Sequence, residues 1–291
     1  MFKGSMVALI TPFDAQGRFE EEIYRQLIEF QIENGTDAII PCGTTGESAT
    51  LDYEEHERVI RVCIEQVKKR IPVIAGTGSN STSEAIELSQ HAKEMGADGV
   101  LLVSPYYNKP SQEGLYQHYK KIAESVALPQ VLYNVPGRTG LNMEAKTTIR
   151  LAEIANIVAI KEASGSITQA SEIIAAVGKK MDVISGDDFL TLPMMACGAT
   201  GVISVTANIA PKQVKAMVAA INAGNWNEAK RLHLDLLELH QAMFIESNPV
   251  PVKTALKLMG KSAAHVRLPL VALQSESLKT LTTVLKSQGL I

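Results

Sequence analysis

Eight short apolar runs recur along the chain, each followed by a longer segment with helical periodicity. The runs are rich in Val, Ile and Leu and lack polar alternation, which is typical of parallel strands buried on both faces. They lie at Val7–Thr11, Ala38–Pro41, Pro72–Ala75, Gly99–Val103, Gln130–Tyr133, Ile157–Ile160, Asp182–Ser185 and Gly201–Val205. Such units predict an α/β fold, a single (β/α)₈ TIM barrel, which needs roughly 250 residues. A doubly wound open sheet shares the alternation and is the alternative.

The helical segments carry their own start signals and continue after the last strand. Asp52 is an expected N-cap for a helix over Tyr53–Arg70, with Glu55 in the capping-box position. Helices alone are expected after residue 224, at Trp226–Met243, Val250–Met259 and Glu276–Ser287. We therefore expect a catalytic barrel over residues 1–224 and a C-terminal helical extension over residues 225–291 that packs on it.

Composition excludes several classes of partner. The net charge of −3 provides no basic field for nucleic acid or for an anionic membrane. No stretch approaches the ~20 apolar residues of a membrane span. The three cysteines are too few and too scattered for a disulfide framework, and their odd number suits a reducing compartment. We expect a cytoplasmic protein.

No motif indicates a metal. The six histidines show no metal-ligand spacing, and five of them fall in helical segments, where we expect solvent-exposed faces. Asp187 and Asp188 follow the seventh run and resemble a metal pair, but a helix cap at the strand end is the better interpretation.

Lys161 ends the sixth run and is the first candidate for catalysis, because barrel enzymes place their active sites at the C-terminal ends of the strands. Burial at a barrel mouth can lower the pKa of a lysine toward ~7–8, which frees a neutral amine. Such an amine attacks a ketone and forms an imine, an electron sink for carbanion chemistry. A lysine that simply leaves the strand for water is the alternative for this residue alone.

Polar groups follow the neighbouring runs. The loop from Gly43 to Ser48 has glycines that permit close backbone approach, and its amides and hydroxyls suit a carboxylate. Tyr133 ends the fifth run and suits proton transfer, while Arg138 offers a planar fork for a carboxylate. A core aromatic and a solvated loop arginine are the respective alternatives. The adjacent aromatics Tyr106 and Tyr107 are expected to pack at an interface.

Together these motifs resemble the 4-hydroxy-tetrahydrodipicolinate synthase (dihydrodipicolinate synthase) family. The resemblance runs essentially end to end and is carried by Gly43–Ser48, Tyr133–Gly140, Lys161-Glu162 and Asn248–Lys253. The first motif and the lysine are shared with the wider pyruvate-dependent class I aldolases, the N-acetylneuraminate lyase superfamily.

The resemblance implies a role for each matching residue. Lys161 corresponds to the Schiff-base lysine, Tyr133 to the proton shuttle, and Thr44 and Tyr107 to its relay partners. Substrate binding is implied for four residues: Thr45, which matches the pyruvate-carboxylate binder, the Ile203 backbone, Gly186, and Arg138, which matches the residue that receives the carboxylate of aspartate semialdehyde. No cofactor is implied, because the lysine itself is the electron sink.

The implied reaction condenses pyruvate with L-aspartate 4-semialdehyde to 4-hydroxy-tetrahydrodipicolinate, the first committed step of the diaminopimelate/lysine pathway. The enzyme would be a lyase, and the family implies a homotetramer built as a dimer of dimers. L-lysine inhibits some members, and the matching positions are Ala49, His56, Asn80, Glu84 and Tyr106. Tyr53 departs from the histidine of the inhibited pattern.

Two rival functions remain open on the sequence. One is another pyruvate-dependent aldolase or lyase, which cleaves a sugar acid or a 4-hydroxy-2-oxo acid. The Arg138 loop favours the synthase over that class. The other is a catalytically inactive barrel that binds a 2-oxo acid as a sensor, against which Lys161, Tyr133 and Thr44 are all present.

Overall fold

The computed structural model describes residues 1–291, and its eight strands form one sheet. The strands are β1 (Gly4–Ala8), β2 (Ala38–Ile40), β3 (Ile74–Gly76), β4 (Gly99–Val103), β5 (Gln130–Asn134), β6 (Ile157–Glu162), β7 (Asp182–Ser185) and β8 (Gly201–Ser204). Their order is β2-β1-β8-β7-β6-β5-β4-β3, so the first and last strands are neighbours. That order belongs to a (β/α)₈ barrel rather than to an open doubly wound sheet, and the predicted fold class is confirmed.

Twelve α-helices and three short 3₁₀ helices connect and follow the strands. They are α1 (Glu21–Glu33), η1 (Ser48–Thr50), α2 (Tyr53–Val67), α3 (Thr82–Met95), α4 (Gln112–Ser125), α5 (Pro136–Thr139), α6 (Ala145–Leu151), α7 (Ile167–Val177), η2 (Asp188–Leu190), α8 (Thr191–Ala196), η3 (Thr206–Asn208), α9 (Pro211–Asn222), α10 (Trp226–Ala242), α11 (Val250–Leu258) and α12 (Ser275–Ser287). None of these helices combines the length and the apolar character that crossing a lipid bilayer requires.

The local signals are partly confirmed. The Asp52 side chain accepts a hydrogen bond of 2.8 Å from the backbone N–H of Glu55, as expected of an N-cap. The helix ends at Val67, before the expected Arg70, because Lys68 takes a left-handed conformation with φ of 50°. The expected first strand, Val7–Thr11, is displaced: β1 lies at Gly4–Ala8, and its residues Met6–Ala8 pair with Ala38–Ile40 of β2.

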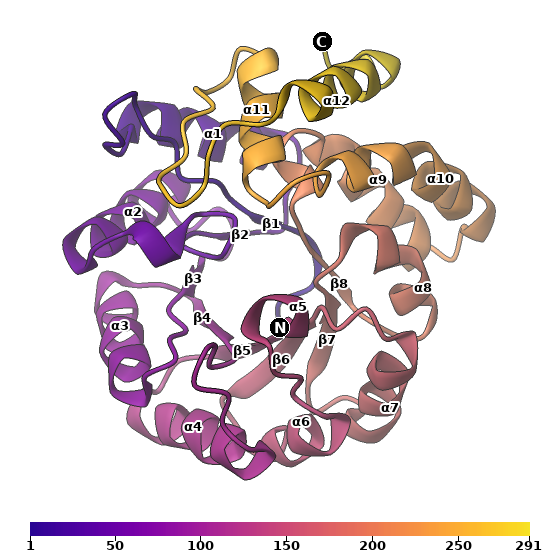
Figure 1. The fold of residues 1–291 in the computed structure, drawn as a ribbon. Helices are drawn as coiled ribbons and strands as arrows, with labels where there is room; N and C mark the ends of the chain where they lie inside the picture. Colours follow the sequence, from indigo (N-terminus) through magenta and orange to yellow (C-terminus); the bar gives the residue numbers. More distant parts are fainter. The chain divides into compact units, whose positions relative to one another are not determined.

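The chain divides into two compact units, of which the first comprises Met1–Gly4 and Pro72–Ile203. In this unit β4, β5 and β6 are consecutive parallel neighbours. Figure 1 shows helices α3, α4, α6 and α7 on the outer side of the strands. Apolar strand residues such as Leu132 and Ile160 have no exposed surface. The ends of β5 and β6 therefore project their polar side chains from a close-packed base.

The second unit comprises Ser5–Ile71 and Ser204–Ile291. It includes β2, α1, α2, η3 and all helices from α9 to α12. Helix α10 packs against α9 and α12, and α11 packs against α12 and η3 (Figure 1). Fully or almost fully buried side chains such as Leu236, Val252 and Leu256 supply apolar contacts there. The domain boundary at residue 224 stays a prediction.

Three of the helical histidines correct an expectation. His56 and His118 are each 6% exposed, and His240 has no exposed surface. The expectation of solvent-exposed faces was wrong for these three residues. His118 accepts or donates a hydrogen bond with Thr82, and burial lowers its pKa to about 4, so its ring is neutral at physiological pH.

Candidate functional site

Lys161 and Tyr133 lie side by side at the ends of adjacent strands. They are register partners in the parallel pair of β6 and β5. The Lys161 Nζ lies 4.3 Å from the centroid of the Tyr133 ring. The two residues are 5% and 6% exposed, so the amine is held away from bulk water against an aromatic face. The structure thus brings together the predicted nucleophile and the predicted proton shuttle.

A buried polar network fixes the next residue of each strand. Asn134 and Glu162 are register partners, and the Asn134 amide donates a hydrogen bond of 3.1 Å to Glu162 Oε2. Gln169 on α7 donates to the same oxygen at 3.2 Å, and the Ser164 N–H donates to Glu162 Oε1 at 2.7 Å. These charge-assisted bonds hold the strand ends that carry Tyr133 and Lys161. Sequence reasoning missed this network.

Gly186 follows β7 and packs directly on the lysine stem. A Cβ atom at this position would lie 3.2 Å from Lys161 Cγ and 2.6 Å from the Cβ atom of Ala163. The Gly186 N–H donates to the Glu162 carbonyl at 2.8 Å. A residue without a side chain is therefore required where β7 passes the lysine.

Asp187 places a further carboxyl group near the lysine. Burial raises the pKa of its carboxyl to about 6, opposed by the positive charge of Lys161 and reinforced by Asp188 and Glu162. Asp187 occupies the N-cap position of η2, as expected, but its side chain makes no capping hydrogen bond. Its partner Asp188 is buried, with 1% exposure.

The remaining predicted residues of this unit differ in exposure. Arg138 lies in the last turn of the short helix α5 and is exposed. Tyr107 is 91% exposed and has a left-handed backbone with φ of 69°, whereas Tyr106 is 39% exposed. Ile203 on β8 is completely buried. Both tyrosines are exposed in this chain, and their packing at an interface stays a prediction.

Three of the residues matched to lysine inhibition also lie together. The Asn80 amide donates to the Tyr106 carbonyl at 3.2 Å. Burial raises the pKa of the Tyr106 hydroxyl, and the nearby Glu84 carboxylate raises it further. Ala49 and His56 belong to the other unit, where Ala49 is exposed and His56 is buried.

The loop from Gly43 to Ser48 lies in the second unit. Thr44 is half-buried and Thr45 is 2% exposed. The Gly46 N–H bonds to the Gly43 carbonyl at 3.0 Å, and a Cβ atom at Gly46 would lie 3.2 Å from the Leu9 carbonyl oxygen. The expected close backbone approach is therefore present at Gly46, whereas a Cβ atom at Gly43 would meet only an ordinary contact of 3.9 Å with the Ile40 side chain.

Side chains from the C-terminal extension contact this loop. The Asn248 amide donates a hydrogen bond of 2.9 Å to Thr45 Oγ1. Lys253 Nζ donates to Glu47 Oε1 at 2.5 Å, and neither side chain is more than 2% exposed. The Arg267 N–H donates to the other Glu47 oxygen at 3.0 Å. Sequence reasoning missed these contacts, although Asn248 and Lys253 both lie in a motif that carried the resemblance.

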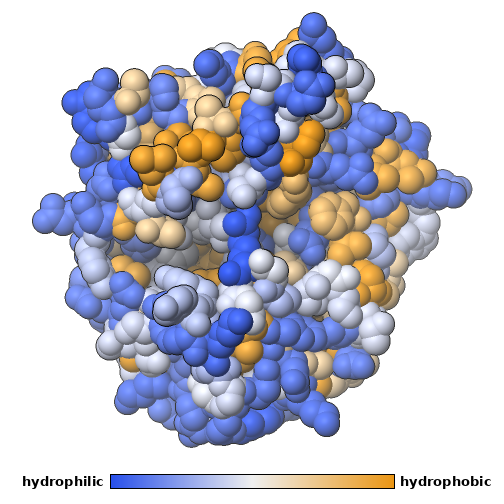
Figure 2. All heavy atoms as spheres, in the orientation of Figure 1, coloured by the Kyte–Doolittle hydropathy of each residue, from blue (hydrophilic) through white to orange (hydrophobic).

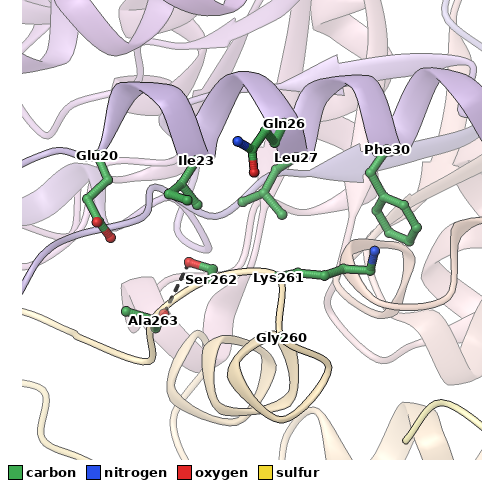
Figure 3. A pocket seen from close by; sticks show the side chains of 9 residues that line it. All are labelled: Glu20, Ile23, Gln26, Leu27, Phe30, Gly260, Lys261, Ser262 and Ala263. Atoms are coloured by element: carbon green, nitrogen blue, oxygen red, sulfur yellow. Dashed lines mark hydrogen bonds between the residues drawn. The ribbon is translucent and has the colours of Figure 1, made fainter.

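A cavity of about 460 Å³ in the second unit includes none of the predicted site residues. It lies between α1 and the segment after α11, and Figure 3 shows Glu20 and Lys261 at opposite ends of it with Ile23 and Leu27 between them. Its lysine ammonium lies 4.0 Å from the Phe30 ring centroid.

Known proteins match the whole chain. A model of the dihydrodipicolinate synthetase family matches residues 1–288. A 4-hydroxy-tetrahydrodipicolinate synthase of Syntrophotalea carbinolica is 70% identical over 291 residues, which cover 100% of this chain and 99% of that protein.

Two solved structures extend the comparison. Chloride-inhibited dihydrodipicolinate synthase from Acinetobacter baumannii, complexed with pyruvate, is 50% identical with a TM-score of 0.99, and the match covers 100% of both chains. The enzyme from Cyanidioschyzon merolae with lysine bound is 42% identical with a TM-score of 0.97, and the match covers 100% of this chain and 99% of that one. The chain belongs to the dihydrodipicolinate synthetase family.

Proposed function

We propose that the chain is a lyase that condenses pyruvate with L-aspartate 4-semialdehyde to 4-hydroxy-tetrahydrodipicolinate, the first committed step of the diaminopimelate/lysine pathway. The pairing of buried Lys161 with Tyr133 across β5 and β6 carries this proposal. The names and end-to-end identity of the relatives support the choice of substrates. The pathway implies a cytoplasmic location.

The reaction begins when the amine of Lys161 adds to the pyruvate ketone and forms an imine with loss of water. The pyruvate methyl group then gives up a proton, and the imine becomes an enamine. The enamine carbon attacks the aldehyde carbon, whose oxygen takes a proton. The amine of the adduct displaces Lys161 and closes the ring, so the free lysine is regenerated.

Each predicted site residue has a role in these reaction steps. Tyr133, with Thr44 and Tyr107 as relay partners, carries protons to and from the imine. Thr45 and the Ile203 backbone bind the pyruvate carboxylate, and Gly186 leaves room beside the lysine. Arg138 receives the carboxylate of the semialdehyde. Its exposure supports this role, because an exposed arginine side chain is accessible to the second substrate.

Reduction with borohydride in the presence of pyruvate tests the covalent step. The proposal expects a mass increase on the peptide that contains Lys161, and no increase elsewhere. A second assay follows product formation with a panel of aldehydes. Absence of the adduct refutes the Schiff-base lysine, while preference for another aldehyde over aspartate semialdehyde favours a different aldolase of the superfamily.

L-lysine is the proposed inhibitor, with a site formed by Ala49, His56, Asn80, Glu84 and Tyr106. The hydrogen bond between Asn80 and Tyr106 and the nearby Glu84 carboxylate support it, as does the lysine-bound relative. Tyr53, which departs from the inhibited pattern, is 45% exposed at the start of α2. A rate that is unchanged by millimolar lysine would contradict this part of the proposal.

Self-association as a homotetramer, a dimer of dimers, is the proposed assembly. The exposed pair Tyr106 and Tyr107 supports it, because aromatic side chains are enriched at protein interfaces. Figure 2 shows further hydrophobic patches among hydrophilic residues on one face. The molar mass from light scattering tests the assembly, and a mass equal to one chain would refute it.

A further inference from the structure

Side chains of the C-terminal extension form hydrogen bonds with two residues of the Gly43–Ser48 loop. The first of these residues is Thr45, which is contacted at its hydroxyl. Asn248 is 5% exposed and donates its amide hydrogen to Thr45 Oγ1. A threonine hydroxyl has one hydrogen to donate and two lone pairs that accept. Since Asn248 occupies a lone pair, the hydrogen of Thr45 is left for another acceptor. The hydrogen bond from Asn248 therefore orients the Thr45 hydroxyl so that its own hydrogen can be donated to another group.

The second point is the carboxylate of Glu47. Glu47 has a left-handed backbone with φ of 53°, which is uncommon for a residue with a side chain and which persists only when surrounding contacts hold it. Lys253 and the Arg267 N–H bond its two carboxylate oxygens separately. Lys253 also donates to the His265 carbonyl at 2.8 Å and lies 4.1 Å from the Phe13 ring centroid. Each charge of this buried pair is therefore satisfied by several contacts.

We propose that Asn248 and Lys253 are positioning residues for pyruvate binding: Asn248 orients the Thr45 hydroxyl as a donor to the substrate carboxylate, and Lys253 holds Glu47 so that the Gly43–Ser48 loop keeps its conformation. The inference rests on the proposed function, in which Thr45 binds that carboxylate. It gives the C-terminal extension a part in substrate binding that is separate from its packing on α9.

The hydrogen-bond direction at Thr45 makes the first half testable with two variants of Asn248. N248A removes the donor and lets the hydroxyl rotate, so KM for pyruvate is expected to rise about fivefold. N248D has nearly the shape of asparagine, but its ionised carboxylate only accepts hydrogen bonds, and it turns the Thr45 hydrogen away from the substrate. N248D is expected to raise KM more than N248A does, with a smaller effect on kcat in both variants.

The pH profile separates positioning from packing. The carboxyl group that N248D introduces donates as the native amide does once it is protonated. The KM ratio of N248D to the native protein is therefore expected to fall as pH decreases from about 8 to about 6. A packing defect would give a ratio that is independent of pH. A KM for pyruvate within about twofold of the native value in both variants would overturn the role of Asn248.

The Glu47 pair is tested with K253M and the double variant E47Q/K253M. K253M leaves a buried carboxylate without its counter-ion, which displaces the loop or unfolds the protein. The double variant removes both charges, and the glutamine that it introduces still accepts from the Arg267 N–H. We expect K253M to raise KM for pyruvate about tenfold and the double variant to recover most of that loss. Lys257 lies four residues further along α11 and is exposed, so K257M is the matched control.

The outcomes distinguish this inference from the proposed function. Borohydride trapping of pyruvate on Lys161 is measured first in the native protein, and its absence refutes the function itself. If the adduct forms in the native protein, the variants then test the positioning role alone. That role is overturned if N248D and the folded double variant have the same half-saturating pyruvate concentration as the native protein. An unchanged value in N248D and in K253M, where K253M folds, overturns it equally. A double variant no better than K253M overturns the part assigned to the charge pair.

Discussion

Replacing Asp187 with asparagine removes a carboxylate that folding holds at a raised pKa. Burial raises the pKa from its ordinary value of 3.8 to about 6, against the attraction of Lys161. A raised carboxyl pKa stabilises the folded state below pH 3.8, and this contribution is lost as pH rises through about 6. At about 1.36 kcal/mol per pKa unit, the ionised carboxylate costs about 3 kcal/mol at neutral pH. D187N is therefore expected to be more stable by up to about 3 kcal/mol at about pH 7.5.

Urea denaturation of both proteins across pH measures the difference. The stability advantage of D187N is expected to shrink as pH falls from about 7 to about 4, because the native carboxyl becomes neutral as well. E172Q on α7 is the control: Glu172 is exposed, and its replacement is expected to change stability by less than about 0.5 kcal/mol at any of these pH values. A D187N advantage that stays constant with pH, or a D187N protein that is less stable than the native one at neutral pH, would refute the reasoning.

Three further substitutions test the site. K161A is expected to lose the borohydride-trapped pyruvate adduct and more than about a thousandfold of the rate in a protein that still folds; retained activity would contradict the nucleophile. G186A places a Cβ atom 2.6 Å from Ala163 Cβ, so it is expected to lower the free energy of unfolding by about 1–3 kcal/mol and to lower kcat. An unchanged melting temperature would contradict this expectation. R138A is expected to raise KM for aspartate semialdehyde about tenfold or more and to leave that for pyruvate unchanged, since a bidentate charged bond is lost; an equal rise for both substrates would argue against its assignment.

The location of the lysine at the strand end was readable from the sequence, because a buried parallel strand is a continuous apolar run whose end is marked locally. Residues 157 to 160 form such a run, and Lys161 follows it near the end of β6, beside Tyr133 on β5. The C-terminal limit of β1 could not be predicted, because the strand ends where Ala8 pairs with Ile40 of β2 and not where the apolar stretch ends. The resemblance, not residue spacing, named the substrates.

Polar contacts between distant residues could not be predicted in the same way. Asn248 and Thr45 are 203 positions apart, and Lys253 and Glu47 are 206 positions apart. A lysine on an amphipathic helix is most often solvated. Lys253 is nevertheless completely buried, because the buried carboxylate of Glu47 pairs with its ammonium. Asp187 is a second example, because its buried surroundings, and not the residue type, set the pKa of its carboxyl.

The sequence by itself determined the alternation of strands and helices and the lysine at a strand end, since both depend on neighbours along the chain. Only the tertiary structure decided which charged and amide side chains are buried together, because the partner that offsets the cost of desolvation comes from far along the chain.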